Sequence, residues 1–314
     1  MDFKYYIGYS TDEENRYLSS SGGIGSALIK YLMENSGYGT SMTFQFNKEE
    51  CRYEPKLIYD YKEYNNCGSV YQDTDTIVFI KNNLNKIKNG IVVTCMPCQV
   101  RPIKSLLNRN DIRHFIISLC CSGQTTVQGT WYYYKLLGVD KKDVLNIQYR
   151  GKGWPSGIEI NLRNNETIKK ANYTFPWNLV HESLLFTPKR CLYCNKKISD
   201  DGDVNIADPW LDEYIQNDTI GNSIVICQTE EAQKVINRLI ACQAVVLTKI
   251  QESVFIESQK GTIEEKANIR KYKPLYRIVE KLGATGSLYK RIVMSSLFLL
   301  KIHVKILKLA KKGF

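Results

Sequence analysis

Short apolar runs alternate with segments of helical periodicity along most of the chain. Ile91–Thr94 and Phe115–Leu119 are two such runs, and Val100, Ile103 and Leu107 recur between them at three- and four-residue steps. This strand–helix–strand pattern predicts two parallel strands, because a helical crossover returns the chain in the same direction. We therefore expect an α/β fold with a mixed or mostly parallel sheet, flanking helices and ligand-binding loops at the strand ends.

The same patterns predict elements on both sides of this unit. Further strands are expected at Phe3–Tyr9, Tyr38–Phe46, Leu57–Tyr61, Val144–Tyr149, Ile158–Leu162, Asp203–Ala207, Ser223–Gln228 and Val245–Thr248. Helices are expected from Ile24 onward and at Thr76–Ile87, Thr125–Leu137, Glu230–Ala241 and Leu288–Leu309. The 314 residues suffice for one large domain or two modest ones.

The chain contains ten cysteines. The N-terminal stretch has no basic region followed by an apolar core, so we predict no signal peptide and expect a cytoplasmic protein. Cysteines stay reduced in the cytoplasm, so metal ligation or redox chemistry is expected before disulfides. Four cysteines stand alone and are expected to be packing residues: Cys51, Cys67, Cys227 and Cys242.

The other six cysteines form three pairs: Cys95 and Cys98, Cys120 and Cys121, and Cys191 and Cys194. The first two pairs follow the two strands of the predicted parallel unit, whose carboxyl ends lie at one edge of the sheet. One cysteine of each can therefore meet there. The C-x-x-C pair can complete a site with four thiolates. The spacing does not decide which cysteine of the first two pairs takes part.

Two other motifs favour anion binding. Ser19–Gly23 opens a predicted helix and leaves backbone N–H groups free to hold a phosphate; the alternative is an N-cap with a flexible turn. Arg150–Trp154 places two cations between glycines, which suits a phosphate or a carboxylate; the alternative is a solvated hairpin turn.

Taken in order, these motifs resemble the beta subunit of the coenzyme F-420 hydrogenase/dehydrogenase family, whose members are iron–sulfur flavoproteins. The matching pieces lie between about Tyr5 and Gln259: Ser19–Gly23, Gly68–Gln72, Pro97–Gln99, Cys121–Gly123, Arg150–Trp154 and Arg190–Trp210. The chain departs from the family pattern at three places. Ser122 replaces a histidine, Met96 replaces a threonine, and Ala207–Leu211 lacks two glycines.

The resemblance implies a 4Fe-4S cluster, FAD and an oxidoreductase that passes electrons between them to reduce a small organic substrate. The implied cluster ligands are Cys98, Cys121, Cys191 and Cys194. The implied cofactor-binding residues are Ser20, Ser21, Gly22, Gly23, Ser69, Tyr71, Gln99 and Arg150. Lys152 and Asp208 are the catalytic candidates, because they lie in family motifs beside the expected cofactor.

The resemblance also bears on partners. The sequence lacks the ferredoxin segment that begins many bacterial relatives, so we expect an external electron donor such as a ferredoxin. Bacterial relatives often occur among genes for surface polysaccharide assembly, which makes a glycan-linked substrate the expected class. The alternative is a non-catalytic scaffold in which four cysteines hold a structural zinc ion.

We expect three segments. Residues 1–140 carry flavin and cluster elements, residues 141–265 carry the C-x-x-C element, and residues 266–314 form a basic amphipathic helical tail. The tail holds 13 Lys and Arg against one acidic residue, whereas the rest of the chain has a net charge near zero. Because the charge belongs to one terminal element, we expect no nucleic-acid partner.

The longest uncharged run of the tail helix, Ile292–Leu300, is shorter than the roughly 20 residues that a membrane span needs. We expect residues 288–312 to lie on the inner face of a membrane. The alternative is a helix that packs on the domain with its lysines outward.

Overall fold

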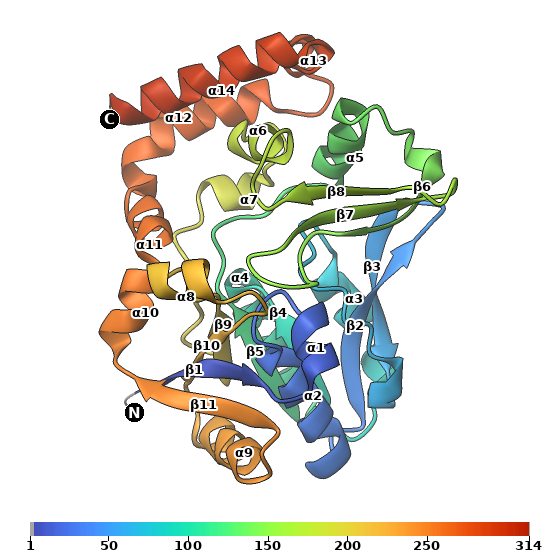
Figure 1. Ribbon diagram of the computed structural model, residues 1–314, viewed down its shortest axis with the longest axis vertical. Coiled ribbons are helices and arrows are strands. Elements are labelled where there is room, and N and C mark those ends of the chain that lie inside the picture. The colour runs from blue at the N-terminus through green and yellow to red at the C-terminus, as the bar shows by residue number, and fades with distance from the viewer. Residues whose placement is uncertain (1–2, 314) are drawn as a thin grey trace.

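A mixed sheet of eight strands runs through the computed structural model, which describes residues 3–313 (Figure 1). In chain order the strands are β1 (Lys4–Ser10), β2 (Thr40–Asn47), β3 (Arg52–Ile58), β4 (Ile91–Cys95), β5 (His114–Leu119), β9 (Val204–Ala207), β10 (Ser223–Cys227) and β11 (Val245–Ile250). In space their order is β11-β1-β10-β9-β5-β4-β2-β3. The neighbours from β9 to β2 are parallel, and the outer pairs are antiparallel. This confirms the predicted α/β class.

Helices cover both faces of the parallel part of the sheet. Helices α2 (Ile24–Asn35) and α9 (Glu230–Ala241) pack on one face, which Val92 and Phe115 share. Helices α3 (Thr76–Asn82) and α4 (Pro97–Arg109) pack on the other face, against alternate residues of the same strands. Since both faces of these strands are buried, their sequences are continuous apolar runs, which is the feature that predicted them.

A second, antiparallel sheet holds β6 (Val144–Gln148), β7 (Gly157–Leu162) and β8 (Thr167–Ala171). Its core is built with helices α5 (Val127–Leu136), α6 (Trp177–Glu182), α13 (Leu288–Ser295) and α14 (Leu297–Lys312). Tyr133, Trp177 and Leu300 are fully buried or nearly so within this core. The last two helices of the chain are therefore part of the folded body, along its upper edge in Figure 1.

The remaining elements are short except for α12, which has 14 residues. They are α1 (Glu13–Leu18), η1 (Tyr61–Glu63), η2 (Leu84–Lys86), η3 (Lys141–Asp143), α7 (Lys189–Leu192), α8 (Asp212–Asn217), α10 (Glu252–Ser258), α11 (Lys260–Ala267) and α12 (Ile269–Leu282). The helix predicted at Thr76–Ile87 ends early and continues as the 3-10 turn η2. The strand predicted at Leu57–Tyr61 begins earlier, and its Pro55 is tolerated because β3 is an edge strand.

The tail differs from a single amphipathic helix. Ser296 adopts an extended conformation and its side chain accepts from the N–H of Phe298, so α13 ends and α14 begins there. The three predicted segments share structure, because β1 lies between β10 and β11 and so joins residues from both sides of position 140. Within residues 3–313, none of the helices combines the length and the apolar character needed to cross a membrane.

Candidate functional site

The carboxyl ends of several strands meet at one edge of the large sheet. Strands β4, β5 and β9 are parallel, so the loops that follow Cys95, Leu119 and Ala207 lie at this edge. The sequence predicted this arrangement for the first two loops. The third loop adds Asp208 to the same edge. Open α/β sheets bind ligands at this end of their strands.

A cavity of about 810 Å³ opens at this edge. Its volume lies within the range of about 300–1,000 Å³ that is typical of cofactor and ligand sites. Most of the predicted site residues line it: Ser20, Ser21, Gly23, Ser69, Tyr71, Cys98, Gln99, Cys121, Arg150, Cys191 and Asp208. Gly22, Lys152 and Cys194 are not part of the lining. The fold thus gathers residues from positions 20 to 208 around one space.

The serine–glycine turn is fixed to the sheet at its glycine end. The Ser21 hydroxyl lies 2.8 Å from that of Ser223, which also accepts from the N–H of Gly22 at 2.9 Å. A Cβ atom on Gly22 would come within 2.5 Å of the Gly8 carbonyl oxygen, so this position requires glycine. Gly23 has a φ of +73° and starts α2, whose first turn borders the cavity. The dipole and free N–H groups of this helix end favour an anion.

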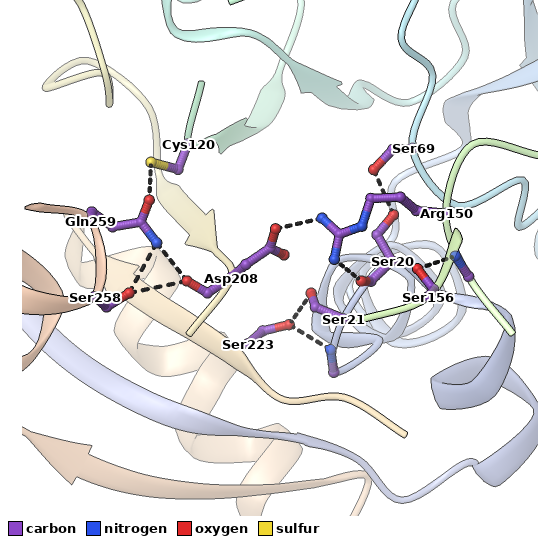
Figure 2. Close-up of polar contacts among 12 residues, drawn as sticks. Ser20, Ser21, Ser69, Cys120, Arg150, Ser156, Asp208, Ser223, Ser258 and Gln259 are labelled. Atoms are coloured by element: carbon purple, nitrogen blue, oxygen red, sulfur yellow. Dashed lines mark hydrogen bonds and ion pairs between the residues drawn. The ribbon is translucent and has the colours of Figure 1, made fainter. Parts of the chain in front are cut away.

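Arg150 and Asp208 form an ion pair in the cavity wall (Figure 2). The Arg150 side chain is only 3% exposed and donates to the Ser20 carbonyl at 2.6 Å. Its guanidinium lies 5.1 Å from the centre of the Trp154 ring and 5.4 Å from that of Trp210. Burial lowers the pKa of Arg150, but Asp208 and Tyr71 together more than offset this, so the pKa is raised and the group stays charged. Its Nε is buried without a partner among the described residues, so the cation keeps one free donor.

Lys152 lies outside this cavity. Its ammonium pairs with the carboxylate of Glu159, which also pairs with Lys169 at 3.2 Å. Its backbone N–H donates to the Tyr17 carbonyl at 2.6 Å. The structure therefore does not bring the two catalytic candidates together, and a role for Lys152 in chemistry remains a prediction.

The four thiols predicted as cluster ligands come from three separate segments of the chain, and Cys98, Cys121 and Cys191 line the cavity. Cys98 lies in the first turn of α4 and is exposed; the adjacent Gln99 caps this turn by accepting from the Met96 N–H at 2.9 Å. Cys121 follows β5. Cys191 belongs to α7, and the Cys194 N–H donates to its carbonyl at 3.3 Å. Gln99 thus positions the helix turn that carries one thiol.

The thiols influence one another electrostatically. Burial, together with the Cys191, Cys98 and Cys194 thiols, raises the pKa of Cys121 to about 11, although Lys266 opposes the shift. Burial also raises the pKa of Cys98 and Cys191, and Arg190 opposes it. Among residues 3–313, no three His, Cys, Asp or Glu side chains are gathered as ligands of a single metal ion. The site therefore has four neighbouring thiols and two cations, Arg190 and Lys266, which influence the charge of the thiols.

Several site residues were missed by the sequence analysis. Lys266 was counted as tail charge, but it is buried and donates to the Cys194 carbonyl at 3.0 Å. Gln259 donates to the Asp208 carbonyl and lies 3.5 Å from the Cys120 sulfur (Figure 2). Lys197 donates to the Gln259 carbonyl at 2.7 Å, and burial lowers its pKa to about 8. These residues lie in or beside short helices without a strong apolar period, so only the tertiary fold reveals them.

One imidazole also reaches the cavity. His181 of α6 lines the wall, with its Nδ1 3.4 Å from the Thr125 hydroxyl and its ring 5.7 Å from that of Tyr173. Burial lowers the pKa of His181, so it is neutral at physiological pH. No sequence motif marked this residue.

Known proteins resemble this chain in sequence pattern and in fold. The family model for the C-terminal part of the coenzyme F420 hydrogenase/dehydrogenase beta subunit matches residues 88–253, which is more than half of the chain. No match was found among curated proteins. The chain is similar to a chain of the F420-reducing [NiFe] hydrogenase complex from Methanosarcina barkeri, solved with xenon derivatization. The TM-score is 0.64 and the identity 14%, covering 90% of this chain and 94% of the other, so this likeness concerns the fold.

Proposed function

The chain belongs to the coenzyme F420 hydrogenase/dehydrogenase beta subunit family, as the order of its motifs predicted, and we propose that it is an oxidoreductase dependent on FAD and one 4Fe-4S cluster. It would pass electrons between the two groups and reduce a small organic substrate. One observation carries this proposal. The serine–glycine turn and three of the four thiols line the same cavity, although they lie far apart in the sequence.

The cavity suits FAD in size and in chemistry. The first turn of α2 offers donors to phosphate oxygens, and the Arg150–Asp208 pair fixes the cavity wall beside it. Tyr71 and Trp177 stack at 6.4 Å and add an apolar surface suited to a flat ring system. We therefore expect Ser20, Ser21, Gly23 and Arg150 to hold the phosphate end of the cofactor.

The four thiols suit a 4Fe-4S cluster in their number and in the charges that surround them. Cys98, Cys121, Cys191 and Cys194 would each hold one iron atom of a 4Fe-4S cluster, whose four irons need four separate sulfur ligands. Arg190 and Lys266 offset the negative charge of the thiolates, because they lie close enough to lower the thiol pKa values. A single structural zinc ion held by the same four thiols is the alternative, and metal analysis distinguishes the two.

When bound, FAD would exchange a hydride with the substrate and single electrons with the cluster. The chain's own residues bind, orient and protonate. Asp208 holds the Arg150 guanidinium in place through their ion pair, and the neutral His181 is placed to accept a proton at the cavity wall. Asn65, Asn66, Asp73 and Asn172 add polar groups to the lining, which would suit the hydroxyls of a glycan-linked substrate.

The electron donor would meet the protein at Cys98. This thiol is exposed at the surface, and the Arg190 guanidinium lies close enough to lower its pKa. A positive charge beside an exposed cluster ligand favours an acidic electron carrier, such as a ferredoxin.

Anaerobic purification tests the proposal. We expect a brown protein with flavin and iron–sulfur absorption, and with iron and acid-labile sulfide in equal amounts. Cys98→Ser should lose the cluster, whereas Cys95→Ser and the matched surface control Cys242→Ser should keep it. A colourless protein after reconstitution with flavin, iron and sulfide, holding one zinc ion per chain, would instead identify a structural scaffold.

A further inference from the structure

Helix α14 divides its side chains into three sectors. Its inner sector is buried against the body and contains Leu300, His303, Val304 and Leu307. Its outer surface carries an apolar stripe, formed by Phe298, Ile302, Ile306 and Leu309. Beside the stripe runs a lysine flank, formed by Lys301, Lys305, Lys308 and Lys312. Each set follows the steps of three and four residues that place side chains on one face of a helix.

The apolar stripe is well exposed. Phe298 is 69% exposed, Leu309 59% and Ile306 56%. Helix α13 packs against α14 and adds two further exposed apolar residues, Leu288 and Ile292. Single exposed apolar residues are ordinary, but an aligned series of them marks a contact surface. In Figure 1 both helices lie along the outer edge of the molecule, away from the large sheet.

The lysine flank makes the surroundings of this stripe positive. In residues 266–314 the only acidic residue in the sequence is Glu280, and it is already paired with Lys189 and hydrogen-bonded by Tyr193. Lys308 pairs with Glu182 of the body, and Lys301 lies 5.3 Å from the Phe175 ring. Lys305 and Lys312 are exposed and extend the positive edge beyond these contacts.

We propose that the face formed by α13 and α14 docks on the surface of an anionic lipid bilayer. The apolar stripe would enter the boundary between head groups and acyl chains, and the lysine flank would contact anionic head groups. Helices that lie in a membrane interface combine these two features. A second copy of the chain fits less well, because residues 288–312 contain no acidic residue that could pair with the lysine flank of the other copy.

Vesicle co-sedimentation tests the proposal with the full chain. We expect binding to vesicles of equimolar phosphatidylglycerol and phosphatidylcholine, no binding to phosphatidylcholine alone, and release by salt. The double variant Phe298→Ser and Ile306→Ser should abolish binding. Lys305→Gln with Lys312→Gln should weaken partitioning about 30-fold, since each lysine contributes to the attraction of anionic lipid.

Matched controls come from other surfaces of the protein. Val78→Ser removes a similarly exposed apolar side chain (55% exposed) from α3. The double variant Lys48→Gln with Lys86→Gln removes two exposed charges. Both control proteins should bind the vesicles as the wild type does. An unchanged thermal midpoint in every variant establishes folding. The proposal is overturned if the serine double variant still binds, or if neutral and anionic vesicles bind the protein equally well. It is also overturned if the wild type binds no vesicles and instead forms a dimer that the serine double variant cannot form.

Discussion

Arg150 and Asp208 hold each other in the cavity wall, and each loses its partner if the other is replaced. Arg150 is almost fully buried, whereas Asp208 is partly exposed. We predict that Asp208→Asn lowers the free energy of unfolding by about 3 kcal/mol, because it leaves a buried cation without its counter-charge. Urea unfolding measures this change. Asp140→Asn removes an exposed carboxylate and should leave the urea midpoint unchanged. Equal midpoints for both variants would mean that the pair does not stabilise the wall.

His303 makes the stability of the tail depend on pH. Its Nε2 lies 2.8 Å from the Ser183 carbonyl and must carry the proton, and its Nδ1 accepts from the Tyr289 hydroxyl at 2.8 Å. Burial lowers the pKa of His303 below its ordinary value of 6.5. The unfolded chain therefore binds a proton at a higher pH than the folded chain does. The stabilisation is complete above the unfolded pKa and is lost as the pH falls through the folded one.

We therefore predict that acid lowers the free energy of unfolding between about pH 7 and pH 5, and that His303→Gln reduces this slope. Urea unfolding at a series of pH values measures it. His181 retains part of the slope in the variant, because burial lowers its pKa too. The control, His114→Gln, replaces a histidine outside both sites and should keep the wild-type slope. A slope unaffected by His303→Gln would exclude His303 as its source.

The sequence identified many chemical groups of the site but not how they meet. Residue types and spacing marked the cysteines, the serine–glycine turn and the Arg150 motif. The contact between Arg150 and Asp208 joins residues 58 positions apart, which lie in the loops that follow β6 and β9. Nothing in the local pattern specifies such a contact, because β6 and β9 belong to different sheets and the contact depends on how the two sheets pack. The same reason explains why Lys266 was counted as surface charge although it is buried beside Cys194.

At the scale of elements, helices and strands were predicted where their burial produces a regular pattern of apolar residues in the sequence. Strands β4 and β5 are buried on both faces, so their apolar runs predicted them and their parallel pairing. Strand β8 was not predicted, because its residues Thr167–Ala171 are mostly exposed and polar and leave no apolar run in the sequence. The break at Ser296 was also missed, since the apolar steps of α13 and α14 continue across it.

The two faces of α14 should differ sharply in their contribution to stability. Leu300 is fully buried in the core of the second sheet, whereas Leu309 lies on the exposed stripe. We predict that Leu300→Ala lowers the free energy of unfolding by about 2–5 kcal/mol, because it opens a cavity in that core. Leu309→Ala, the same change on the same helix, should stay within about 0.5 kcal/mol of the wild type. Equal effects in urea unfolding would mean that α14 does not pack as described.

At the scale of the molecule, the cavity joins parts of the chain that the sequence analysis treated separately. Its lining includes Ser20 and Cys98 from the first predicted segment and Arg150, Cys191 and Asp208 from the second. The large sheet crosses the same boundary through the pairing of β1 with β10. A ligand in this cavity therefore contacts both segments, and it should stabilise them together.

We predict that FAD raises the stability of the whole protein in one cooperative transition. A ligand that binds only the folded state at 100 times its Kd adds about 2.7 kcal/mol to the free energy of unfolding. Calorimetry with increasing FAD measures the shift of the thermal midpoint. Asp208→Asn should reduce the shift by disturbing the Arg150 wall, whereas Phe298→Ser, far from the cavity on α14, should keep it in full. Two separate transitions, of which FAD moves only one, would show that the two segments unfold independently and that the cavity does not couple them.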